Sequence, residues 1–290
     1  MLDWEKAVYV DVCTFDSLKE KGRMVISLIE DILKHFFLPY RSQLKIHLER
    51  FDFKSQSSKY NIKAWNKVVS MVLNGEIRHL LINYTQNEEL HQPELALSIT
   101  FDYSYNDALL EDTVIANNIA LSINRRIFNL NIPIDVQNML KETFINVFQD
   151  LNGVIGYIDM GIPHATIAPN ATSFEGLQGY YFTEYSHMFG IYARGYFWGN
   201  VLTEKHIEKL GGISVIKEKA PCCIVNDFVF GDGRKAVYLQ LSEDINLYTD
   251  EQLKHLRDFF KPILPEKNME YINQADPSGE IRKSARVFFD

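Results

Sequence analysis

Residues 94–103 read ELALSITFDY and carry the clearest strand signal in the chain. Large apolar side chains occupy every second position: Leu95, Leu97, Ile99, Phe101 and Tyr103. The positions between them are mostly small or polar. A period of two is the side-chain period of a β-strand, so the stretch predicts a strand with one buried face. One-sided burial is typical of antiparallel sheets.

Strands and helices are mixed along the rest of the chain. Further strands are predicted at 7–15, 45–53 (with a bulge), 77–84, 153–161 and within 221–241. Helices are predicted after the Ser17–Glu20 capping box and up to Pro39, at 61–74 and 135–149, from Thr172 to about 188, and after the Thr249–Gln252 box. Residues 113–129 fit a helix or a strand. Asp232-Gly233 predicts a type I′ hairpin turn.

No long linker, internal repeat or low-complexity segment divides the chain of 290 residues. The order of elements therefore predicts one α+β domain, with largely antiparallel sheet and helices packed against it. We expect this domain to cover residues 1–265. Residues 266–290 form a polar C-terminal extension.

Composition narrows the function classes. The formal net charge of −8 argues against nucleic-acid binding, because nucleic-acid-binding proteins need a basic face for phosphate.

Cys13 lies far in sequence from the adjacent pair Cys222 and Cys223. This arrangement fits neither a disulfide framework nor the spacing of zinc ligands. The start, MLDWEKAVYVDVCTF, lacks a secretory signal, and no apolar run approaches a membrane helix. We therefore expect a cytoplasmic protein with no membrane contact and no cofactor.

Catalytic motifs are sparse. There is no P-loop, no G-x-S-x-G elbow and no histidine pair at zincin spacing. The best catalytic candidates are Asp159, His164 and His187, which could hold a metal or act as acid and base if the fold gathers them. A metal-dependent hydrolase is therefore the alternative hypothesis. The plainer interpretation of the same three residues is a turn aspartate and surface histidines.

Acidic residues and tyrosines gather in FDYSYNDALLED, residues 101–112. This composition suits a protein-binding surface, because carboxylates attract a basic partner and tyrosines anchor interfaces. The plainer interpretation of the segment is a solvated face. The residues expected to bind a partner are Asp102, Tyr103, Tyr105, Asp107, Glu111 and Asp112.

Residues 193–212, ARGYFWGNVLTEKHIEKLGG, combine aromatics, a short amphipathic helix and a double glycine. Thr203 is a suitable N-cap, and Leu202 and Ile207 have the spacing of a hydrophobic staple. Gly211 and Gly212 can adopt the left-handed conformation that ends a helix. None of these features is a nucleophile or a ligand set, so the stretch predicts a structural corner.

The order of these features resembles the type VI immunity family, bacterial proteins encoded beside secreted effectors that they neutralise. The resemblance rests on Tyr196, Trp198, Leu202, Leu210, Gly211 and Gly212, and extends more weakly over residues 7–265. It implies a protein that acts by binding and carries no catalytic residue. It does not identify the toxin.

The resemblance and the acidic balance together lead to an expected function. We expect an immunity protein, not an enzyme, that occludes the active site of a cognate effector toxin acting in the cytoplasm. A nuclease suits this hypothesis, because its basic site would attract an acidic inhibitor. A non-enzymatic scaffold or defence component stays open. The 15 tyrosines and 19 phenylalanines suit a homodimer or an ordinary core.

Overall fold

The computed structural model of the chain describes residues 7–86, 93–101, 116–161 and 186–266, together with 273, 274 and 278. The helices are α1 (Gly22–Ile32), α2 (Ile62–Leu73), α3 (Ile134–Asp150), α6 (Glu204–Lys209), α7 (Ile213–Lys219) and α8 (Asp250–Phe260). A π-helical turn η1 (Leu33–Phe37) and a 3-10 turn η2 (Leu38–Gln43) continue α1. Shorter 3-10 turns are η4 (Arg125–Phe128), η5 (Ser186–Met188) and η6 (Lys261–Ile263).

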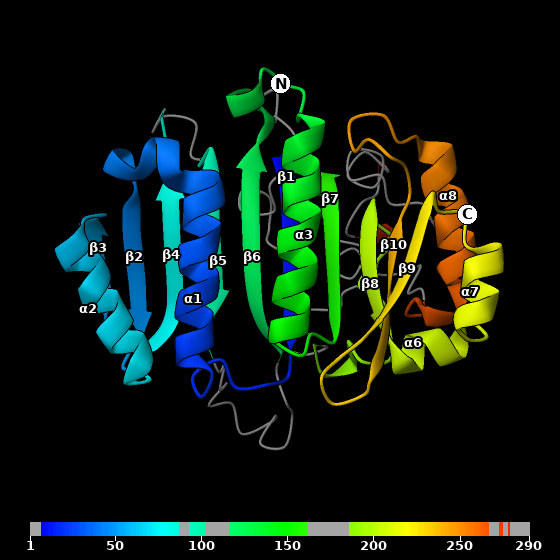
Figure 1. The fold of residues 1–290 in the computed structure, drawn as a ribbon, viewed down its shortest axis with the longest axis horizontal. Coiled ribbons are helices and arrows are strands. Elements are labelled where there is room, and N and C mark those ends of the chain that lie inside the picture. Colours follow the sequence, from blue (N-terminus) through cyan, green and yellow to red (C-terminus); the bar gives the residue numbers. More distant parts are fainter. Residues whose placement is uncertain are drawn as a thin grey trace.

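The strands are β1 (Ala7–Thr14), β2 (Lys45–Arg50), β3 (Ser55–Lys59), β4 (Ile77–Tyr84), β5 (Leu95–Thr100), β6 (Asn117–Asn124), β7 (Ile155–Gly161), β8 (Gly199–Thr203), β9 (Ile224–Val229) and β10 (Lys235–Gln240). They form one ten-stranded sheet in the order β3-β2-β4-β5-β6-β1-β7-β8-β10-β9 (Figure 1). Every neighbouring pair is antiparallel. The expected α+β fold with an antiparallel sheet is therefore confirmed.

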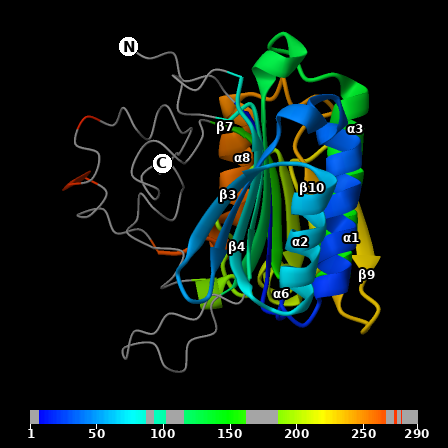
Figure 2. The same cartoon turned by 90° about the vertical axis from the view of Figure 1, so that its left-hand side faces the viewer.

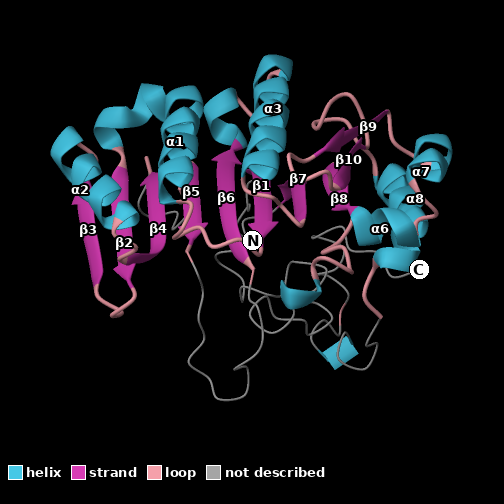
Figure 3. Cartoon of the chain, turned by 60° about the horizontal axis from the view of Figure 1, so that its bottom comes forward, coloured by secondary structure: helices cyan, strands magenta, loops and turns pink. Residues whose placement is uncertain are grey.

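The helices form two groups around the sheet. Figure 2 shows α1, α2 and α3 on one face of the sheet, and Figure 3 shows α6, α7 and α8 together at the end formed by β8, β9 and β10. The N-terminal strand β1 lies in the middle, between β6 and β7. Among the described residues, no helix is both long and apolar enough to cross a bilayer.

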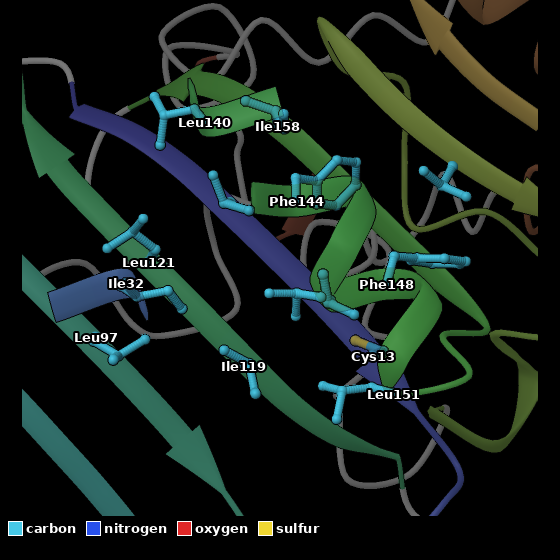
Figure 4. Packing of buried hydrophobic residues seen from close by; sticks show 14 of the residues in the cluster. Cys13, Ile32, Leu97, Ile119, Leu121, Leu140, Phe144, Phe148, Leu151 and Ile158 are labelled. Carbon is cyan, nitrogen blue, oxygen red and sulfur yellow. The ribbon is translucent and has the colours of Figure 1, made fainter. Parts of the chain in front are cut away.

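The main core lies between α3 and the centre of the sheet. Leu140, Phe144 and Phe148 share one face of α3 because they recur at helical spacing, and all three are buried. Figure 4 shows them together with Ile119 of β6 and Ile158 of β7, the strands on either side of β1. Gly156 makes room for this packing, because a Cβ atom there would lie 2.7 Å from the Phe144 ring.

The quoted strand lies where the alternation predicts it. Leu95, Leu97, Ile99 and Phe101 are buried, whereas Ala96, Ser98 and Thr100 are half-buried. The ambiguous segment 113–129 contains strand β6 and then the 3-10 turn η4. Pairing with β1 and β5, both distant in sequence, selects the strand.

Two predicted helix ends were wrong. The Ser17 hydroxyl accepts a hydrogen bond from the Glu20 N–H at 3.1 Å, but this turn precedes α1, which begins at Gly22. Pro39 does not end an α-helix, because α1 gives way at Leu33 to the π-helical turn, and Pro39 sits in the first turn of η2. The helix predicted from Thr172 lies outside the described residues except for η5.

The type I′ turn at Asp232-Gly233 was also wrong. Only Gly233 has a positive φ there, +89°, whereas a type I′ turn needs two such residues. The Gly233 N–H donates to the Phe230 carbonyl at 3.0 Å, and the Phe230 N–H to the Arg234 carbonyl at 2.9 Å. This is a three-residue loop with a glycine bulge.

Candidate interaction surface

The acidic partner-binding residues predicted at 102–112 lie outside the described residues, as does His164. The structure describes the two strands that this segment joins. Buried Phe101 follows β5, buried Ala116 precedes β6, and β5 and β6 are paired neighbours. The predicted patch therefore falls in the part of the chain between β5 and β6.

The corner at 196–212 is held by hydrogen bonds within itself and to Ser242. Asn200 accepts from the Phe197 N–H at 3.2 Å and donates to the Phe197 carbonyl at 2.7 Å. The buried indole of Trp198 donates to the Ser242 hydroxyl at 3.0 Å. Gly199 is closely packed, since a Cβ atom there would lie 3.2 Å from the Tyr238 hydroxyl.

The helix of this corner, α6, begins and ends as its sequence indicates. Thr203 is the N-cap, and the His206 Nδ1 atom accepts from the Thr203 N–H at 3.3 Å. Gly211 and Gly212 both have positive φ, 91° and 95°. Tyr196, Leu202 and Leu210 are buried. These contacts are structural, and none of them leaves a reactive group directed to solvent.

Asp159, one of the catalytic candidates, receives hydrogen bonds from two neighbouring elements. The Tyr248 hydroxyl donates to its carboxylate at 2.8 Å, and the Trp198 N–H donates at 3.2 Å. His187 is exposed on η5. Within the described part of the chain, no group of three or more His, Cys, Asp or Glu residues could hold a metal ion. The carboxylate of Asp159 thus fastens β7 to the corner and to the start of α8.

A buried ion pair lies beside Asp159 on the same face of the sheet. The Arg194 guanidinium and the Asp11 carboxylate are 2.9 Å apart, with side chains only 10% and 11% exposed. Arg194 also lies over the rings of Tyr157 and Phe189, 5.3 and 5.1 Å from their centroids. The thiol of Cys13 is 3.5 Å from Arg194. The pair connects the loop after η5 to the middle strand β1.

The sheet face opposite α1–α3 carries small or polar side chains over β2, β4, β5 and β6, which we call the polar face. All of its members are half-buried, and they are Lys45, His47, Glu49, His79, Leu81, Asn83, Ala96, Ser98, Thr100, Asn118, Ala120 and Ser122. The strand register aligns them in rows across the sheet, and the row through Ala120 continues to Asp11 on β1.

The polar face is internally bonded along β4. His79 Nε2 and Ser98 Oγ lie 2.9 Å apart, and Arg78 donates to Glu49 at 2.8 Å. Burial lowers the pKa of His79 below its ordinary value, an effect that the charge of Glu49 opposes and that of Arg78 reinforces. Burial thus favours the neutral form of this imidazole.

Sequence reasoning missed most of this surface. The signal was present in residues 94–103, because Ala96, Ser98 and Thr100 form the part of the face on β5, but it was used only to predict the strand. The Arg194–Asp11 pair had no sequence signal, since 183 residues separate its members.

No family model matches the sequence, and no curated protein matches it. Among solved structures, the fold is similar to that of the Pseudomonas aeruginosa T6SS protein PA0821, with a TM-score of 0.60. The alignment covers 97% of this chain and 83% of that chain, at 11% sequence identity. At such low identity, the similarity concerns the fold. It defines the class as a single α+β domain whose architecture also occurs in a type VI secretion (T6SS) protein.

Proposed function

We propose that this protein is a type VI secretion immunity protein, which binds a cognate effector toxin and blocks its active site. The observation that carries the proposal is the fold shared with a T6SS protein over 97% of the chain. The proposal adds to that fold a partner and a mode of action, binding without catalysis.

The charge balance supports a partner with a basic surface. The net charge of −8 favours encounter with a positively charged active site, such as the phosphate-binding site of a nuclease. Asp102, Tyr103, Tyr105, Asp107, Glu111 and Asp112 remain the residues proposed to contact it.

The arrangement around Asp159 favours binding over hydrolysis. A general base or metal ligand needs a carboxylate that is open to the reacting molecule. Here the Tyr248 hydroxyl and the Trp198 N–H both donate to the Oδ1 atom of this carboxylate. Its described surroundings therefore suit a structural role.

Coexpression tests the proposal directly. The effector encoded beside this gene is expressed from an inducible promoter in bacteria, with or without this protein. The proposal expects survival only with this protein, and a purified complex of the two. Toxicity unchanged by coexpression, together with no complex by gel filtration, would refute it.

Charge reversal locates the contact. The variant Glu111→Lys/Asp112→Lys is expected to weaken effector binding by at least about tenfold at low salt and to make it less sensitive to salt. The matched control is Glu204→Lys/Glu208→Lys, which changes the net charge equally on the exposed side of α6. Equal affinity of both variants at low salt would reject the patch.

A further inference from the structure

A pocket opens between the end of α1 and the start of α2, on the helical side of the sheet. Its volume is about 280 Å³, and buried Leu33, Phe37, Leu44 and Trp65 line its apolar interior. This volume is large enough for one aromatic or branched aliphatic side chain. None of these residues takes part in the polar face or in the corner at 196–212.

Local backbone geometry keeps the pocket open. The π-helical turn Leu33–Phe37 widens the end of α1, and such turns often occur at functional sites. The Trp65 indole is held in place because its Nε1–H donates to Glu30 at 3.0 Å. Tyr40 in η2 stacks on Tyr84 of β4, with centroids 4.5 Å apart. The pocket is therefore preformed, and a partner need not order it.

The rim of the pocket exposes large apolar side chains. Leu38 is 56% exposed and Ile62 is 65% exposed, and both line the pocket. Leaving such residues in water forgoes roughly 25 cal/mol for each Å² that a partner could cover. Exposed apolar residues around an apolar pocket are typical of a protein-binding site.

Two cations stand at the same rim. Lys34 and Arg41 line the pocket and are exposed, and in the described structure neither forms an ion pair. Arg41 lies over the Tyr60 ring, 5.5 Å from its centroid, which holds the guanidinium close to the opening. The lining holds one acidic residue, Glu30, which accepts from Trp65, so its cations outnumber its acidic residues two to one. The rim is thus positive on a chain whose net charge is −8.

We propose that this pocket binds an aromatic or branched aliphatic side chain of the effector, next to a carboxylate that pairs with Arg41 and Lys34. This inference rests on the proposed immunity function and adds to it a second contact of opposite polarity. The acidic segment 102–112 would meet a basic part of the effector, and the pocket an acidic one. Two contacts of opposite sign fix the orientation of the partner and exclude effectors that match only one.

Binding of the effector to surface variants tests the pocket. Leu38→Ala/Ile62→Ala removes exposed apolar surface, and Arg41→Glu reverses the charge. Each is expected to weaken binding by at least about tenfold. The controls are Ile134→Ala, a 51% exposed apolar residue on α3, and Lys63→Glu, an exposed position outside the pocket on α2. Far-ultraviolet circular dichroism checks that every variant is folded.

The possible results separate the two proposals. If the effector binds the wild type but the pocket variants bind within twofold of it, the pocket inference is overturned and the immunity function stands. If the effector does not bind the wild type, both are overturned.

A small probe tests the chemistry of the pocket without the effector. We expect 3-phenylpropionate to shift the NMR resonance of the Trp65 Nε1–H, and 2-phenylethylamine to bind at least about fivefold more weakly. Arg41→Glu should reverse this order. Preference of the wild type for the amine, or no shift with either compound, would contradict the inference.

Discussion

His206 is a fully buried histidine on α6, and its environment makes stability depend on pH. Burial lowers its pKa from 6.5 to about 4; backbone hydrogen bonds at Tyr192 and Phe189 oppose this shift, and the charge of Lys209 adds to it. Between these values the unfolded chain binds more protons than the folded chain. The stabilisation is therefore complete above about pH 6.5 and is lost as the pH falls towards 4.

The shift corresponds to about 3 kcal/mol of unfolding free energy. Urea unfolding at pH 7.5 and 4.5 measures it. We expect the wild type to lose about 2–3 kcal/mol more than His206→Gln between these two conditions. An equal loss in both proteins would show that His206 is not the responsible group. His79 remains in both and so cancels in the comparison.

The Arg194–Asp11 pair predicts a double-mutant result. Arg194→Met leaves the Asp11 carboxylate buried without its cation, which should cost about 3–5 kcal/mol. Adding Asp11→Leu removes that charge, so the double variant should be more stable than Arg194→Met alone. Guanidinium unfolding of all three proteins decides the matter. A double variant that is less stable than Arg194→Met would contradict a charge-based explanation.

The junction between α6 and α7 depends on backbone conformation. Gly212, the N-cap of α7, has φ 95° and ψ 167°, a combination that essentially only glycine adopts. A Cβ atom at this position would meet no other atom within 4 Å, so Gly212→Ala tests the backbone alone. We expect a loss of about 1–3 kcal/mol of stability.

Gly231→Ala is the matched control for this junction. Its Cβ also meets nothing within 4 Å, but its φ is not positive. We expect a change of less than about 1 kcal/mol, because alanine tolerates such a backbone and restricts the unfolded chain. Thermal melting of both variants compares the stability lost at Gly212 with that lost at Gly231. Equal melting temperatures would show that the positive φ of Gly212 is not what makes its replacement costly.

The continuous sheet predicts that the described domain unfolds as one unit. Trp65 lies on α2, at the end of the sheet that carries β2 and β3. Trp198 precedes β8, on the other side of the central strand β1. With Trp4→Phe as background, Trp65→Phe and Trp198→Phe each leave one reporter. In each variant the fluorescence and circular dichroism midpoints in urea should coincide. Separate midpoints would divide the chain into two domains.

Function also depends on the whole molecule, because the two proposed contacts come from separate segments of the chain. The acidic segment joins β5 to β6, whereas the pocket lies between α1 and α2. A combined variant, Glu111→Lys/Asp112→Lys with Arg41→Glu, is expected to lose binding by roughly the product of the two separate losses. Titration calorimetry with the effector measures this. A combined loss no larger than one single loss would indicate a shared contact.

Local patterns determined much of the fold from the sequence alone. The alternation in 94–103 specified the buried side of β5, and the caps Thr203 and Thr249 specified where α6 and α8 begin. These features are readable because a cap or a strand period involves residues only two to four positions apart. The corner at 193–212 followed from the same kind of signal.

Tertiary structure alone decided the remaining features. The state of 113–129 required the pairing of β6 with β1, more than a hundred residues earlier, and the π-helical turn replaced the helix end predicted at Pro39. The Arg194–Asp11 pair, the polar face and the pocket each combine side chains from distant segments. No local sequence pattern predicts these contacts. The strand order that brings the side chains together is set by burial of the whole sheet against its helices.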